Sequence, residues 1–294
     1  MNIRHLKIFV TVAECGKMRM AADKLHITQP SVSQAIKELE TYYGIKLFDR
    51  LAQRIYITQT GKQLLPYAHH IVDSYESMEE YAFDVAKKER IRVGGSVTVG
   101  TILLPKILKE LERQINGVDI RVTVDNTTLV EKMVLNSEVD IAIVEGIVES
   151  EDLVQLDIME DELILVVGKN HPFYHQRQIQ LENLQGMNLI SRESGSAERN
   201  QFEHYLAVND INMVCKWSCS NTETIKHAVE SGEGIAILSK LLVEKELQDE
   251  TFHIVYVKDV RIKRNLKLIY HKDKFFSPSM KTFLDICTDG RILH

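Results

Sequence analysis

Apolar residues recur at helical spacing through the first forty residues of the chain. Between residues 5 and 14 they stand three and four positions apart, which predicts a helix with one buried stripe. Residues 21–25 predict a second short helix, and residues 26–27 a turn. A third helix begins after Thr28, whose hydroxyl can cap it. Its apolar side is formed by Val32, Ala35, Ile36 and Leu39. The pattern therefore predicts two short helices and a tight turn that lead into a third, amphipathic helix.

The polar side of this third helix has the residue types that read base edges in the major groove. Glutamine pairs with adenine, lysine with guanine or phosphate, serine with either base, and proline can touch a thymine methyl. The candidate DNA-contacting residues here are Thr28, Gln29, Pro30, Ser31, Ser33, Gln34 and Lys37. An ordinary solvated amphipathic helix carries the same residue types, so this helix alone leaves both interpretations open.

Two short β-prone runs, at residues 47–50 and 54–58, follow the third helix and predict a hairpin beside it. Arg50 and Arg54 flank its turn, where they could reach backbone phosphate or the minor groove. A surface ion pair is the alternative for each. The first sixty residues carry nine basic and five acidic side chains, while the whole chain has a formal charge of −6. A basic head on an acidic body favours contact between the head and DNA.

Residues 60–86 predict one long helix, with Gly61 and Pro66 near its start. Its apolar residues alternate at steps of four and three, which is the period of a helix packed along a partner helix. They are Leu64, Ala68, Ile71, Tyr75, Met78, Ala82 and Val85. We expect this helix to pair with a second copy of the chain. Packing on the protein's own C-terminal body is the alternative.

From residue 91 onward, short β-branched runs alternate with amphipathic helices. Strands are expected at residues 92–99, 119–124, 141–144, 163–167, 189–190, 214–217, 235–238 and 266–270. Helices are expected at residues 102–111, 128–136, 198–207, 222–231, 240–247 and 278–287. This alternation implies an α/β body with mostly parallel sheets.

Ligands of such sheets bind at the carboxyl ends of strands, near helix N-termini. Hydroxyl, amide and carboxyl groups follow several of the expected strands. The candidate effector-binding residues are Ser96, Thr98, Thr101, Asn126, Thr127, Thr128, Glu145, Ser194, Asn221 and Thr222. Helix capping is the alternative role for each serine, threonine and asparagine among them.

The first sixty residues resemble the amino-terminal domain of the LysR-type transcriptional regulators. The resemblance rests on Ala21–Ala22, Leu25, Thr28 to Ser33, Ile36, Leu39–Glu40, Gly44, Leu47–Phe48 and Arg50. Met18–Arg19–Met20 departs from the family pattern at the edge of a helix. Residues 96–100 and 220–226 are similar to the CysL-like, sulfur-assimilation branch, which implies a small anion or amino-acid derivative as effector.

The resemblance implies a winged helix-turn-helix, a linker helix and a two-lobed α/β effector domain resembling periplasmic binding proteins. We expect these at residues 1–59, 60–90 and 91–294, with lobe I at 91–162 and 267–294 and lobe II at 163–266. The expected function is sequence-specific transcriptional regulation, controlled by a small polar or anionic metabolite between the lobes. The expected partners are promoter DNA with dyad symmetry, the effector and further copies in a homodimer or homotetramer, with RNA polymerase as an additional candidate.

Composition argues against several other functions. The sequence has no secretory leader and no apolar run of about 20 residues, so we expect a cytoplasmic protein without a membrane partner. Its four cysteines should then be reduced thiols. No phosphate loop, nucleophile elbow or metal-ligand motif occurs, so we expect no enzyme activity, cofactor or metal. The competing hypothesis is a metabolite-binding protein or enzyme whose first sixty residues are only a docking domain.

Overall fold

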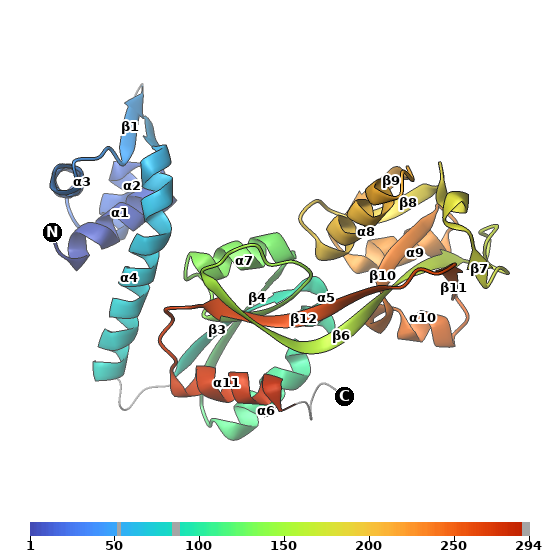
Figure 1. Ribbon diagram of the computed structural model, residues 1–294. Coiled ribbons are helices and arrows are strands. Elements are labelled where there is room, and N and C mark those ends of the chain that lie inside the picture. Colours follow the sequence, from blue (N-terminus) through green and yellow to red (C-terminus); the bar gives the residue numbers. More distant parts are fainter. Residues whose placement is uncertain (52–53, 84–88, 290–294) are drawn as a thin grey trace. The chain divides into compact units, whose positions relative to one another are not determined.

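The computed structural model describes residues 1–51, 54–83 and 89–289. The chain divides into two compact units, the first formed mainly by the residues up to Lys88 and the second by most of the remainder. The first unit is a helical head with a two-stranded hairpin and one long helix (Figure 1). Its elements are α1 (Ile3–Cys15), α2 (Met18–Lys24), α3 (Gln29–Tyr43), β1 (Phe48–Leu51), β2 (Arg54–Ile57) and α4 (Gln59–Phe83). The predicted helices and hairpin strands up to residue 58 are confirmed, and the long helix predicted at residues 60–86 is confirmed as far as Phe83, since residues 84–86 lie outside the described residues.

The head is stabilised by a closed apolar core and by one glutamate that joins α3 to the hairpin. Phe9 of α1 is fully buried and meets Phe48 edge to face, with ring centroids 5.6 Å apart. Helix α3 ends at Gly44, whose φ of 67° suits glycine in a left-handed cap. The Glu40 carboxylate accepts hydrogen bonds from the backbone N–H of Leu47 at 2.9 Å and of Phe48 at 3.3 Å. The hairpin is therefore fixed relative to α3.

Helix α4 divides the predicted apolar seam between two environments. Ala68 is buried in the head core, together with Val72, which the seam did not include. Ile71 and Met78 are instead 48% and 58% exposed, and Tyr67 is exposed near them. Val85 lies outside the described residues, and so does the side chain of Ala82. The start of α4 is thus part of the head, while some of its apolar side chains have no cover in this unit.

The second unit is built on one long, twisted sheet whose strand order is β4-β3-β5-β12-β6-β10-β8-β9. Strand β11 adds to β6, and β7 to β11. Its strands are β3 (Arg90–Ser96), β4 (Asp119–Asp125), β5 (Ile141–Glu145), β6 (Leu153–Gly168), β7 (Gln178–Ile179), β8 (Asn188–Arg192), β9 (Val214–Cys219), β10 (Ile235–Ser239), β11 (Phe252–Val257) and β12 (Ile262–His271). Its α-helices are α5 (Val97–Ile102), α6 (Leu104–Gln114), α7 (Thr127–Leu135), α8 (Ala197–Val208), α9 (Thr222–Glu230), α10 (Glu244–Gln248) and α11 (Pro278–Thr288).

The sheet is shared by two lobes (Figure 1). Lobe I contains β3–β5, α5–α7 and α11; lobe II contains β7–β11 and α8–α10. Strands β6 and β12 run antiparallel from one lobe into the other and pair from Leu153↔His271 to Leu163↔Ile262. Lobe I has one apolar core, and lobe II has a core on each face of its sheet. Because two continuous strands join the lobes, residues in the middle of β6 and β12 lie at the lobe junction.

The structure corrects two sequence expectations for this unit and adds two strands that were not predicted. The strand expected at 92–99 ends at Ser96, because residues 97–102 form α5. The strand expected to open lobe II at residue 163 begins at Leu153, inside lobe I. Residues 154–158 alternate apolar and polar side chains, whereas residues 163–167 are all apolar. The sequence therefore predicted a strand only at the apolar end. Strands β7 and β11 were not predicted: β7 has only two residues and pairs with β11, and β11 pairs with β6, a partner about 85 positions earlier in the chain.

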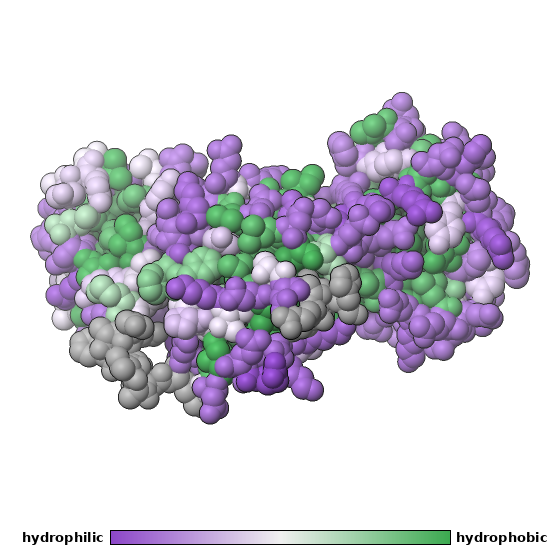
Figure 2. Space-filling model, turned by 60° about the horizontal axis from the view of Figure 1, so that its bottom comes forward, coloured by the Kyte–Doolittle hydropathy of each residue, from purple (hydrophilic) through white to green (hydrophobic). Residues whose placement is uncertain are grey.

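None of the helices in the described part of the chain is both long and apolar enough to span a membrane. Figure 2 shows polar residues over much of one face of the molecule, with apolar residues between them.

Candidate functional site

Helix α3 presents a polar face that no other part of the head covers. Thr28 caps the helix and accepts a hydrogen bond from the Ser31 backbone N–H at 3.4 Å. The predicted apolar side, Val32, Ala35, Ile36 and Leu39, is buried, which confirms the helical phase. Ser33 is half-buried. The other predicted DNA-contacting residues of this helix are exposed: Thr28, Gln29, Pro30, Ser31, Gln34 and Lys37. The face therefore has the shape and the exposure that groove insertion requires.

The side chain of Gln34 is held by a neighbour that the sequence interpretation missed. Its Nε2 donates a hydrogen bond to Glu38 at 2.8 Å, and Glu38 also bonds to the His5 ring at 2.8 Å. Hydrogen bonds from His5 and Gln34 lower the pKa of Glu38, so this exposed carboxylate is charged. The spacing of four between Gln34 and Glu38 was the available signal. Gln34 is thus oriented before it meets a partner.

The predicted hairpin is present as β1 and β2, with Phe48 opposite Ile57 and Leu51 opposite Arg54. Residues 52–53 at its turn lie outside the described residues. The backbone of Arg50 and Arg54 belongs to the two strands, but their side chains also lie outside the described part of the structure.

A second polar site lies at the lobe junction and is centred on Glu145. This residue ends β5, is buried, and accepts hydrogen bonds from the hydroxyls of Ser96 and of Thr98, the latter at 3.0 Å. The Thr127 hydroxyl donates to the backbone carbonyl of Glu145 at 3.1 Å. Four predicted effector residues from three strand ends, Ser96, Thr98, Thr127 and Glu145, are therefore brought together.

Arg264 of β12 connects this lobe I group to lobe II. Its Nε donates to Asp161 of β6 at 2.8 Å, and its Nη2 donates to the Thr98 hydroxyl at 3.3 Å. Its guanidinium also lies 3.6 Å from Glu145 and 3.5 Å from Glu198 at the start of α8. We call Glu145, Asp161, Glu198 and Arg264 the junction cluster. All four are buried, and they come from lobe I, from both crossing strands and from lobe II.

The junction cluster has more acidic than basic groups, because the carboxyl groups of Glu145, Asp161 and Glu198 surround one guanidinium. Burial raises the pKa of Glu145, and repulsion from Glu198 and Asp161 adds to the effect, while Arg264 opposes it. Burial disfavours the charge of Arg264, but its three carboxylate neighbours outweigh burial and raise its pKa. Arg192 lies 3.8 Å from Glu198 and is itself bound through two hydrogen bonds of 2.9 Å to Glu193. This second cation therefore leaves the excess of carboxylates unchanged.

Two residues of the junction cluster and two hydroxyl residues of lobe II each have a buried polar atom without a hydrogen-bond partner among the described residues. These atoms are the hydroxyls of Ser191 and Thr222, Oε2 of Glu198 and Nη1 of Arg264. Ser191, Ser239 and Thr222 stand at or just beyond the carboxyl ends of β8, β10 and β9, the sheet edge where α/β proteins bind ligands. Each unsatisfied buried group costs about 1–3 kcal/mol. Such groups concentrated at one edge are typical of a binding site.

The remaining predicted effector residues lie apart from the junction cluster or serve as helix caps. Asn126 accepts from the Leu129 N–H at 3.1 Å, and the Thr128 N–H donates to Gly195 of lobe II at 3.4 Å. Thr101 is exposed and donates to the Val97 carbonyl. Asn221 is exposed and caps α9, as the alternative interpretation proposed. Ser194 is also exposed.

Sequence reasoning missed Asp161, Glu198, Ser239 and Arg264. The Ser239 hydroxyl donates to Asp161 at 2.8 Å, and its N–H donates to Glu198 at 3.4 Å. Asp161 and Arg264 face each other across the β6–β12 pair, 103 positions apart in sequence. A charged residue beside an apolar strand run was the only local signal. An acidic residue in the first turn of α8 is too common to single out Glu198.

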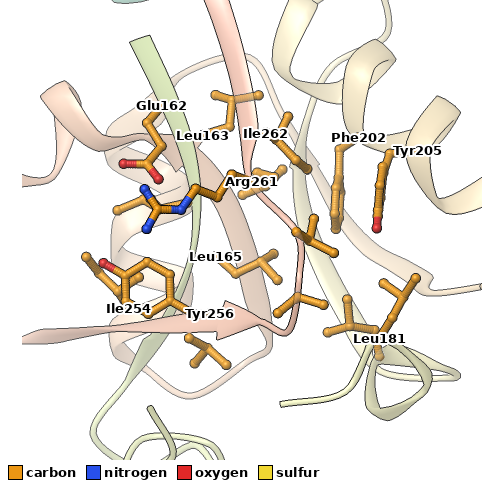
Figure 3. Close-up of a pocket in the computed structure, with 16 residues that line it drawn as sticks. Glu162, Leu163, Leu165, Leu181, Phe202, Tyr205, Ile254, Tyr256, Arg261 and Ile262 are labelled. Carbon is orange, nitrogen blue, oxygen red and sulfur yellow. The ribbon is translucent and has the colours of Figure 1, made fainter. Parts of the chain in front are cut away.

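A separate pocket lies inside lobe II (Figure 3). Phe202 and Tyr205 of α8 and Leu181 line it, and Arg261 extends toward Glu162 at its edge. It encloses an empty volume of about 430 Å³, part of which is open solvent. None of the predicted effector residues lines it, and its walls are mainly apolar. The convergent polar groups of this unit are therefore at the lobe junction.

Two family models match the chain. A model described as bacterial regulatory helix-turn-helix protein, lysR family, matches residues 3–62. A model described as LysR substrate binding domain matches residues 86–291. Together they match most of both units and leave residues 63–85 between them.

The chain is also similar to full-length transcriptional regulators, which are not enzymes. It is 32% identical over 290 residues to a Phaeodactylum tricornutum protein named "Probable RuBisCO transcriptional regulator", covering 96% of this chain and 94% of the relative. It is 31% identical over 267 residues to the HTH-type transcriptional regulator CysL of Bacillus subtilis, covering 90% and 89%. The two identities are nearly equal, so they assign a family and not a branch.

Among solved structures, the regulatory domain of CcmR from Synechocystis, in complex with 2-PG, has the same fold as the second unit. Its TM-score is 0.64 at 24% identity, and the match covers 69% of this chain and 97% of that chain.

Proposed function

The chain belongs to the LysR family of DNA-binding transcriptional regulators, and from this premise we propose the residues that read DNA and the site that senses an effector. The first proposal, that α3 reads DNA, rests on the exposed polar face of this helix. Gln34 and Lys37 stand on this face, opposite a buried apolar side, and can contact base edges from the major groove. Arg50 and Arg54 of the wing are assigned to phosphate or the minor groove. A regulator of chromosomal DNA works in the cytoplasm.

The second proposal is that the effector binds at the lobe junction. Ser96, Thr98, Thr127 and Glu145 converge there with groups from lobe II, as expected for a site that senses a small polar metabolite. Binding changes the activity only if the effector has different affinities for two arrangements of the protein. The proposed set also includes Asn126, Thr128, Thr222, Thr101, Ser194 and Asn221, which form no hydrogen bond with the junction cluster in the described part of the chain.

Oligomerisation belongs to the same proposal. Family members form oligomers, and the exposed apolar residues Tyr67, Ile71 and Met78 of α4 are available to a second copy. We assign residues 1–59 to DNA binding, 60–90 to dimerisation, and 91–294 to effector binding. Two heads held at a fixed spacing would match a dyad-symmetric promoter, as a dimer or tetramer. RNA polymerase is the partner through which such a regulator changes transcription.

Selection of bound fragments from genomic DNA, followed by mobility-shift titration, tests the DNA-reading assignment. Lys37→Ala should weaken binding to the selected site by about 1–3 kcal/mol, roughly 5- to 150-fold, and relax sequence preference. Lys109→Ala, an exposed helical lysine of the second unit, is the matched control and should bind like the unaltered protein. Wild-type affinity should fall steeply with salt, since counterions are released from DNA. Equal affinity of the unaltered protein for selected and scrambled DNA would refute the assignment.

A further inference from the structure

The effector site at the lobe junction has an electrostatic character that limits what it can bind. Its three buried carboxylates share one guanidinium, and the nearby Arg192 is bound to a fourth carboxylate, Glu193. Desolvated charges interact strongly, since little water screens them. A small anion placed beside this group would be repelled by the excess of negative charge.

Unsatisfied hydrogen-bonding groups indicate which atoms a ligand must bring. Glu198 is 1% exposed, and its Oε2 lies 3.8 Å from Nη1 of Arg192 but has no hydrogen-bond partner among the described residues. This atom can only accept, so it requires a donor. The hydroxyls of Ser191 and Thr222 can donate or accept, and Nη1 of Arg264 can only donate. A cationic donor would satisfy Oε2 of Glu198, and a polar oxygen on the same ligand would satisfy Nη1 of Arg264.

The spacing of the carboxylates argues against a metal ion as that cation. Among the described residues, Glu145, Asp161 and Glu198 do not form a group whose ligand oxygens all lie within 4.8 Å of one another. Shared metal coordination requires such proximity. An ammonium group bonds at longer distances, about 2.7–2.9 Å from nitrogen to each oxygen, and needs no fixed coordination geometry.

We infer that the effector of this regulator is a small molecule carrying a primary ammonium group, bound against Glu198 at the lobe junction with the excess carboxylates of the cluster as its counter-charge. This inference rests on the proposed effector function. The ammonium donates to Oε2 of Glu198, and a carboxylate, carbonyl or hydroxyl oxygen of the ligand accepts from Nη1 of Arg264. Free amines can make only the ammonium contact, whereas amino acids can make both contacts, and the test separates the two classes.

The test compares three molecules of equal chain length that differ only in their end groups: cadaverine with two ammonium groups, δ-aminovalerate with one ammonium and one carboxylate, and glutarate with two carboxylates. Thermal unfolding of the full chain is followed by the fluorescence of Trp217, its only tryptophan, which lies on β9 of the second unit. We expect an amine-bearing molecule to raise the midpoint by about 5–10 °C at roughly 100 times its Kd. Glutarate should leave it unchanged. A larger rise of the midpoint with cadaverine would indicate that the effector is an amine. A larger rise with δ-aminovalerate would indicate that the effector is an amino acid.

Glu198→Gln keeps the side chain's size and removes its charge, so it should weaken the amine response tenfold or more. Glu203→Gln is the matched control, because Glu203 lies on the same helix and pairs with Arg199 at the surface. Should Glu198→Gln fail to fold, the charge series on the unaltered protein still decides. Stabilisation by glutarate equal to that by the amines, or no response to any amine at millimolar concentration, would overturn the inference.

DNA retention is measured on the same preparation, so the two proposals fail separately. Amine stabilisation without DNA retention removes the proposed DNA-reading role and leaves the ligand assignment. DNA retention together with selective stabilisation by glutarate removes the ligand assignment and leaves the DNA-reading role.

Discussion

Arg264 is the residue on which the charge balance of the lobe junction depends, and Arg264→Met tests that reasoning most directly. Its side chain is 1% exposed, and it is the one cation within 4.0 Å of Asp161 among the described residues. It also lies within 3.6 Å of both Glu145 and Glu198. Methionine fills much of the same volume but leaves the buried Glu145 and Asp161 without a counter-charge and Glu198 with Arg192 alone.

The expected loss follows from the general cost of breaking a buried ion pair. Removing one partner destabilises a protein by about 3–5 kcal/mol. In a domain of roughly 150–250 residues, each kcal/mol lowers the unfolding midpoint by about 2–4 °C. The midpoint of the second unit should therefore fall by about 6–20 °C. Because the remaining carboxylates can take up protons, the difference from the unaltered protein should narrow as the pH falls.

Thermal and urea unfolding followed at Trp217 measure this change in the full chain without interference from the head, which has no tryptophan. Arg113→Met is the control, since Arg113 pairs with Glu110 at the surface of α6 and such pairs contribute little. A midpoint of Arg264→Met at neutral pH equal to that of the control would refute the account of the junction cluster.

Three further changes test other contacts. Gly146→Ala would place a Cβ 2.7 Å from a side chain of α8 in lobe II, at a φ of 88°. It should lower the unfolding midpoint more than Gly186→Ala, where φ is 73° but, beyond the two chain neighbours, no described atom lies within 4 Å of the added Cβ. Equal losses in the two variants would contradict a steric contact between the lobes. Gly61→Ala would bring a Cβ to 2.5 Å from the Leu47 carbonyl oxygen. We expect weaker DNA retention and a lower unfolding midpoint of the head, measured by circular dichroism. Unchanged values of both would show that the hairpin can move to make room for the methyl group. Burial raises the pKa of Glu145 above its ordinary value of 4.5. Between pH 4.5 and the pKa of the folded state, the folded protein therefore keeps a proton that the unfolded chain loses. Stability is lost as the pH rises through this range. Glu145→Gln should flatten that slope in urea unfolding at several pH values, and an unaltered slope would count against the raised pKa.

The sequence alone was sufficient for the head, because its signals are local. Helical period, the Thr28 cap, the glycine after α3 and the two strands of the hairpin each depend on residues a few positions apart. The same locality identified the exposed polar face of α3, since burial of Val32 and Leu39 fixes which residues lie opposite. Alternating strands and helices also predicted an α/β body, and they placed Ser96, Thr98, Thr127 and Glu145 at strand ends that meet.

Only the tertiary structure decided what those strand ends meet. Arg264 reaches Thr98 from a position 166 residues away in sequence, and it reaches Asp161 through the register of two antiparallel strands. A register is set by long-range packing, and a shift of one residue would turn Arg264 to the other face of the sheet. For the same reason, the seam on α4 could not show that Ala68 packs into the head while Ile71 stays exposed. Which charges lose their water depends on how distant segments pack, and no local pattern of the chain records that.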